Sequence, residues 1–140
     1  MLEQGGRRIM EFITAEQFLK EDKKVQEVFI DWWKPSIGDL YYYDESDCLN
    51  VISEHCCSTN KADEFIKFKK DSIPLLTEGQ LRRFIEDNTG STFTEITYFE
   101  HENGQYDIYT KNVFFENLGN DLLQAYWKVA VYIAKESIKH

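Results

Sequence analysis

The feature that most constrains the fold is the last stretch of the chain, because it predicts a helix with a very wide apolar face. Apolar side chains between about Asn120 and Ile138 cover roughly half of the helical circumference. They are Leu122, Leu123, Tyr126, Trp127, Val129, Ala130, Val131, Ile133 and Ala134. Such a helix is either wedged between two layers of its own chain or shared with a second copy. We expect burial within the chain and keep a homodimer through this helix as the alternative.

Helix-capping signals place two shorter helices near the start of the chain. Thr14 and Gln17 form a capping-box pattern, which predicts a helix start. Asp22 would fall on the apolar face of a single long helix, so we expect a break near Glu21, with Asp22 capping a second helix. Pro35 ends that helix near Trp33, because the residue before a proline avoids helical geometry. The shared apolar face comprises Phe18, Val25, Phe29 and Trp32.

Turn signals predict hairpins in the rest of the chain. Strands at Leu40–Tyr43 and Cys48–Ser53 flank an acidic turn, and strands at 92–99 and 106–109 flank Asn103-Gly104, a strong hairpin signal. A second capping box, Thr77 with Gln80, begins a middle helix with Leu81, Phe84 and Ile85 inside, and Gly90 ends it. Residues 65–70 are compatible with a strand.

This order of elements predicts the α+β class, with an antiparallel sheet of hairpins packed with N-terminal, middle and C-terminal helices. The 140 residues suit one domain, over 10–140. Gln4–Arg8 could be translated from a ribosome-binding sequence just upstream of a start codon at Met10. We therefore expect the native chain to start there, with residues 1–9 as a flexible extension.

Composition excludes several classes of function. The net charge of −9 repels phosphate backbones, so non-specific nucleic-acid binding is not expected. No apolar run is long enough to cross a membrane and no signal peptide is visible, so we expect a cytoplasmic protein. Three cysteines, two of them adjacent, indicate free thiols in a reducing compartment.

Catalytic and metal-binding patterns are weak. The only group of soft ligands is Cys48, His55, Cys56 and Cys57. Its adjacent thiols lack the spacing of a zinc knuckle, and side chains that are adjacent on a strand point to opposite faces. His101 lies among acids at a predicted hairpin tip, where solvent screens it. We therefore predict no catalytic residue, no metal site and no cofactor.

Two groups of residues are candidate binding sites. Trp32 is predicted to be core, whereas an exposed aromatic patch beside acids would bind a protein partner. It comprises Trp33, Tyr41, Tyr43, Asp44, Glu45 and Asp47. The alternative is a basic group that would hold a small anionic, nucleotide-like ligand. It comprises Lys67, Lys69, Lys70, Arg82 and Arg83.

Three segments carry a resemblance: FIDWWKPSIGDLYYYD, IPLLTEGQLRRFIEDNTG and NDLLQAYWKVAVYIAKESIK. In these the chain resembles a group of small accessory proteins encoded by phages and prophages of low-GC Gram-positive bacteria. The resemblance implies a small protein acting in the cytoplasm of the infected host, and no site residue comes with it. Our leading hypothesis is a non-enzymatic accessory protein that binds a host protein, such as a defence nuclease, and inhibits it. Sequestration of a nucleotide-like ligand is the second hypothesis.

Overall fold

The computed structural model describes most of the chain, over residues 11–43, 48–53, 68–90, 95–99, 104–110 and 113–139. Within these ranges, helices and antiparallel strands occur together, which confirms the predicted α+β class. None of the helices described is both long and apolar enough to span a membrane.

Two compact units make up the structure. One combines Met1–Ile13 with Thr77–Ile133, and we call it the sheet-and-α5 unit. The other combines Thr14–Leu76 with Ala134–His140, and we call it the hairpin unit. The predicted single domain over 10–140 and the predicted start at Met10 stay predictions.

Two helices open the hairpin unit, and the predicted break separates them. Helix α2 spans Ala15–Leu19 and α3 spans Lys23–Trp32. Thr14 Oγ1 accepts a hydrogen bond from Gln17 N at 3.2 Å, as the capping pattern predicted. Asp22 does occupy the N-cap of α3, but its side chain makes no capping bond. The junction is held instead by Gln26, whose Nε2 donates to Leu19 O at 3.4 Å and to Glu21 O at 2.8 Å.

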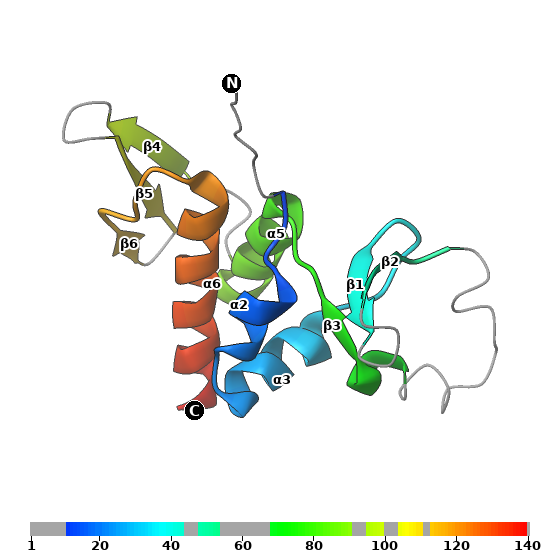
Figure 1. The fold of residues 1–140 in the computed structure, drawn as a ribbon. Coiled ribbons are helices and arrows are strands. Elements are labelled where there is room, and N and C mark those ends of the chain that lie inside the picture. Colours follow the sequence, from blue (N-terminus) through cyan, green and yellow to red (C-terminus); the bar gives the residue numbers. More distant parts are fainter. Residues whose placement is uncertain are drawn as a thin grey trace, which may run out of the picture. The chain divides into compact units, whose positions relative to one another are not determined.

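A three-stranded antiparallel sheet follows in the same unit (Figure 1). Strand β1 (Leu40–Tyr43) lies between β2 (Cys48–Val51) and β3 (Ser72–Pro74). Leu40 pairs with Val51 and Tyr43 pairs with Cys48, so the predicted hairpin is confirmed. Strand β3 contains a proline and lies at an edge of this sheet, where proline removes no central ladder bond.

One expectation about this region is wrong. Residues 68–71 are helical rather than extended, and β3 begins only at Ser72. All four residues of β1 are partly buried. On one face the Phe68 ring packs on Tyr41, with ring centroids 5.1 Å apart.

In the sheet-and-α5 unit, helix α5 (Glu78–Thr89) has both of its predicted end signals. Gln80 N donates to Thr77 Oγ1 at 3.3 Å and Thr77 N donates to Gln80 Oε1 at 2.9 Å, which completes the capping box. Gly90 ends the helix with a φ of 70°, the left-handed conformation that glycine adopts without strain. The predicted inward side chains are all fully buried: Leu81, Phe84 and Ile85.

The second sheet belongs to this unit too, and its strand order is β4-β5-β6 (Figure 1). Strands β4 (Glu95–Phe99) and β5 (Gln105–Tyr109) form the predicted hairpin. Gly104 precedes β5 with a φ of 73°, and a Cβ there would meet the Tyr98 hydroxyl. Strand β6 (Phe114–Phe115) pairs with β5 and was not predicted.

Helix α6 (Leu122–Ile138) confirms the predicted C-terminal helix. The chain itself buries most of its wide apolar face, including Leu123, Tyr126, Trp127, Val129, Ala130, Val131 and Ala134. The large apolar side chains that stay exposed are Tyr132 and Ile138. The homodimer through α6 stays a prediction. Its motive was an apolar face too wide for one chain to cover, and the chain itself covers most of that face.

Candidate functional site

The two tryptophans have the opposite roles to those predicted. Trp33 is 1% exposed and belongs to the core, whereas Trp32 is only partly buried. The reason is that α3 ends at Trp32, and Trp33 has an extended backbone with φ −64° and ψ 125°. Helical spacing therefore does not set the direction of the Trp33 side chain. Its indole Nε1 donates to Asp39 Oδ2 at 3.1 Å, so Trp33 is a structural residue and does not form an exposed patch.

The rest of the predicted partner patch is only partly described. Tyr41 and Tyr43 are partly buried, whereas Asp44, Glu45 and Asp47 lie outside the described residues. Aliphatic side chains that the prediction overlooked are exposed in this region: Ile37 in the turn before β1, and Leu49 and Val51 in β2. The exposure of Leu49 and Val51 has no simple sequence signal, because aliphatic residues in strands are more often buried.

The predicted basic group is only partly described, and its described members belong to two different units. Lys67 lies outside the described residues. Arg82 and Arg83 are exposed on α5, and Arg82 Nε pairs with Glu86 Oε2 at 3.4 Å. Lys69 Nζ donates to Asp31 O at 3.4 Å. Burial lowers the pKa of Lys69, and the Asp31 charge opposes that shift. Lys70 is exposed and lines the cleft described below.

Most of the predicted thiol and histidine cluster lies outside the described residues. His55, Cys56 and Cys57 lie outside the described residues, and so does His101, while Cys48 is described only as part of β2. In the part of the chain that the structure describes, no three potential metal ligands come together.

A candidate binding surface that the sequence did not predict lies on the β4-β5-β6 sheet, and it combines aromatic and acidic side chains. We define the β6 surface as Glu95, Tyr109, Val113, Phe114 and Glu116. Tyr109 pairs with Glu95 on one side and with Phe114 on the other, so the three side chains stand in a row on one face of the sheet. Phe114 is 70% exposed and its ring meets that of Tyr109 edge to face at 5.3 Å.

Acidic groups surround this aromatic pair. Glu95 and Glu116 are exposed, and Asp107 is buried beneath the surface. Asp107 accepts hydrogen bonds from Tyr109 Oη at 3.4 Å and from Asn117 N at 2.9 Å, which orders the segment after β6. Partial desolvation raises the pKa of Tyr109, and the charge of Asp107, its hydrogen bond and the charges of Glu116 and Glu95 raise it further. The face therefore combines an exposed aromatic ring with a negative potential.

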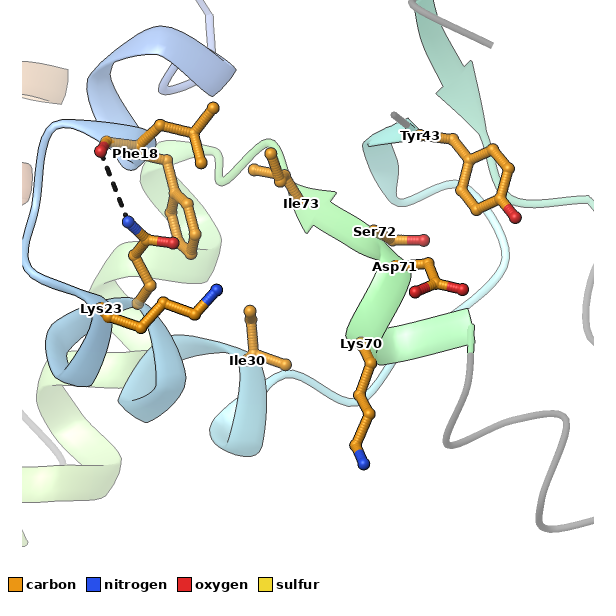
Figure 2. A pocket seen from close by; sticks show the side chains of 10 residues that line it. Phe18, Lys23, Ile30, Tyr43, Lys70, Asp71, Ser72 and Ile73 are labelled. Atoms are coloured by element: carbon orange, nitrogen blue, oxygen red, sulfur yellow. Dashed lines mark hydrogen bonds between the residues drawn. The ribbon is translucent and has the colours of Figure 1, made fainter. Parts of the chain in front are cut away.

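A cleft of about 510 Å³ is the second candidate site, and it lies within the hairpin unit. Helices α2 and α3, strands β1 and β3 and the helical turn at 68–71 all contribute to its walls (Figure 2). Its polar lining consists of Lys23, Gln26, Tyr43, Lys70, Asp71 and Ser72. Its apolar lining consists of Phe18, Leu19, Ile30 and Ile73.

Comparisons with known proteins contribute no assignment. No family model, no curated protein and no solved structure matches this chain.

Sequence reasoning missed both candidate sites for physical reasons. The β6 surface depends on a two-residue strand, which is too short to show a period of two. The cleft joins residues about 50 positions apart, and no local pattern brings Lys23 and Ser72 together. The sequence does place one acidic residue, Asp107, between the aromatic residues Tyr106 and Tyr109.

Proposed function

We propose that this chain is a small acidic accessory protein, not an enzyme, that binds a basic surface of a host protein in the bacterial cytoplasm and blocks it. The single observation that carries the proposal is Phe114, which is 70% exposed on an edge strand beside Tyr109 and among acids. Phe114 and its neighbour Val113, which is 40% exposed, leave adjoining apolar surface in water, and burial of this surface against a partner would be favourable. The resemblance to phage and prophage proteins supports the host context.

Charge complementarity supports a basic partner. The chain carries a net charge of −9, and the charges of Glu95 and Glu116 act on Tyr109, whose ring contacts that of Phe114. Acidic residues at the rim of an interface steer association with a basic surface, and a central aromatic ring supplies the short-range contact. A nucleic-acid channel in a nuclease is a basic surface of this kind, so an acidic protein could occupy it in competition with nucleic acid.

The experiment is a capture from host lysate with purified variants in parallel. Phe114→Ala should weaken binding of the captured protein by about thirtyfold if the ring is a hot spot worth about 2 kcal/mol. Ile37→Ala is the matched control, because Ile37 is also 70% exposed but lies in the other unit. We expect the control to bind as the wild type does.

Charge is tested separately from the ring. The double variant Glu95→Lys with Glu116→Lys should weaken capture most at low salt, where charges are poorly screened. Glu27→Lys makes the same kind of change at an exposed position of α3 and should have little effect. If charge reversal at Asp44, Glu45 and Asp47 abolishes capture while Phe114→Ala does not, the partner binds the β1–β2 hairpin and the β6 surface is excluded.

A further inference from the structure

Strand β6 ends the strand order β4-β5-β6, so only one side of its backbone pairs within this sheet. The direction of each backbone group follows from the turn that precedes the strand. Thr110 N donates to Val113 O at 2.9 Å, which makes Thr110 and Val113 a hydrogen-bonded pair. Such pairs alternate with non-bonded pairs along an antiparallel ladder. Tyr109 and Phe114 are therefore a non-bonded pair, and Phe114 directs its N–H and C=O away from β5.

The backbone groups of Phe114 form an open edge. No residue that the structure describes bonds to them, and the Phe114 side chain is 70% exposed. The next residue is held in place instead, because Phe115 pairs with Ile108 and its ring meets that of Tyr132 on α6 edge to face at 5.2 Å. Successive side chains in a strand point to opposite faces, so α6 holds Phe115 while Phe114 stays accessible.

A bulge ends the regular pairing beyond this edge. A regular ladder would place Asn117 opposite Tyr106. Instead, Leu118 N donates to Tyr106 O at 2.9 Å, and Tyr106 N donates to Gly119 O at 2.8 Å. Asn117 takes a φ of 57°, and its N donates to the buried Asp107 carboxylate at 2.9 Å. The hydrogen bonds of this bulge fix the position of the edge and limit it to a few residues.

The charges beside the edge indicate the composition of a segment that would pair with it. An added antiparallel strand places one residue opposite Phe114, and the residues two positions away from it lie on the same face. An apolar residue opposite Phe114 would contact its ring. Glu116 is exposed two positions after Phe114. A lysine or arginine two positions from the apolar residue would therefore lie beside an acid, which is a favourable cross-strand pair.

We propose that the partner adds an extended segment to the open edge of β6, as a strand antiparallel to it, with an apolar residue opposite Phe114 and basic residues two positions away. In peptide recognition by strand addition, main-chain hydrogen bonds supply affinity and alternate side chains supply specificity. The basic character of the segment rests on the proposed function, because charge complementarity argues for both. The direction of the Phe114 backbone does not depend on that function.

The experiment uses the full chain and a synthetic peptide with the sequence threonine, lysine, threonine, valine, threonine, lysine, threonine. Amide exchange in NMR spectra follows two neighbouring residues. The Phe114 amide should exchange rapidly in the free protein, whereas the Phe115 amide, which is directed toward Ile108, should be protected throughout. Saturating peptide should slow the exchange of the Phe114 amide about tenfold or more. If peptide at about 5 mM leaves that exchange unchanged, the proposal is wrong.

Methylation of the peptide backbone separates strand pairing from charge. When valine lies opposite Phe114, the two residues form a hydrogen-bonded pair and the valine N–H faces β6. A methyl group on the valine nitrogen should therefore weaken binding about tenfold. Methylation of the next threonine nitrogen is the matched control, since that N–H faces away from β6 and the peptide charge is the same. Equal affinities of the two methylated peptides would show attraction by charge alone and would overturn strand addition.

Two substitutions at one position make the same test in the protein. Phe114→Ala and Phe114→Pro both remove the ring, but only proline removes the backbone N–H. No described residue uses that N–H and edge strands tolerate proline, so both variants should keep the wild-type circular dichroism spectrum. Phe114→Pro should bind the unmethylated peptide about fivefold more weakly than Phe114→Ala, as expected for one lost hydrogen bond. The same affinity in both variants would contradict a main-chain contact at this residue.

Failure of this inference and failure of the proposed function give different results. If the lysate capture finds no partner but the peptide protects the Phe114 amide, the edge binds strands and the host-inhibitor function is wrong. If capture depends on the Phe114 ring but the two methylated peptides bind alike, the partner contacts the ring and strand addition is wrong.

Discussion

Truncation of the two adjacent tryptophans tests the central structural finding, that Trp33 is core and Trp32 is not. Trp33 is 1% exposed, its ring lies 6.1 Å from that of Phe68, and its indole donates to Asp39. Replacement of a fully buried large aromatic by alanine costs about 3–5 kcal/mol. Trp32 is partly exposed, so Trp32→Ala should cost only about 1–2 kcal/mol.

These values are large enough to measure. For a chain of this size, a loss of about 4 kcal/mol lowers the unfolding midpoint by roughly 10–15 °C. Urea unfolding followed by circular dichroism at the helix band gives the free energy of unfolding without depending on tryptophan fluorescence. If Trp33→Ala does not fold, Trp33→Phe removes the N–H donor and part of the ring, and should still cost more than Trp32→Phe. A larger loss at position 32 than at position 33 would refute the assignment.

Three further predictions concern the sheet-and-α5 unit. Thr77→Ala removes the capping box of α5 and should lower the free energy of unfolding by about 1 kcal/mol in urea titrations. Gly104→Ala should be destabilising by about 1 kcal/mol because its φ is 73°, whereas Gly79→Ala, in a helix with open space for a Cβ, should be neutral or stabilising in the same assay. The pKa of the Tyr109 phenol is higher in the folded protein than in the unfolded chain. As the pH rises, the phenol therefore loses its proton in the unfolded chain before it does so in the folded protein. Stability should therefore fall as the pH rises above about 10, and Asp107→Asn should reduce the shift in an ultraviolet titration of the phenol.

The elements that were predicted correctly depend on signals within a few residues. The capping box at Thr77, the C-cap at Gly90 and the hairpin at Gly104 each involve hydrogen bonds or dihedral angles set by neighbours in sequence. Their physical cause is visible in the sequence itself, and the structure reproduces all three. The break near Glu21 was predicted because Asp22 would otherwise place a carboxylate on the apolar face of a helix. The break is present, but the Asp22 side chain does not make the predicted capping bond.

The incorrect predictions depend either on the exact residue at which an element ends or on contacts between residues that are far apart in the sequence. Helical spacing continued to Trp33 predicts that its side chain points outward. Helix α3 ends at Trp32, so the extended backbone of Trp33 directs its side chain into the core instead. The pairing of β1 with β3 joins residues about 30 positions apart, and only this pairing makes β1 a central strand. The cleft has the same dependence on distant segments, whereas the β6 surface depends on a strand of two residues that is too short to show a pattern.

The two candidate sites differ in the kind of ligand that their exposed groups can bind. On the β6 surface, an exposed ring protrudes among acids, and no cation of the described residues lies close enough to affect Tyr109. Such an exposed, acidic surface suits a basic protein rather than a small molecule, because a small ligand needs a concave site to bury enough of its area. The cleft of the hairpin unit is instead a partly open hollow lined by polar and apolar side chains, so it can cover more of a small molecule than the β6 surface can.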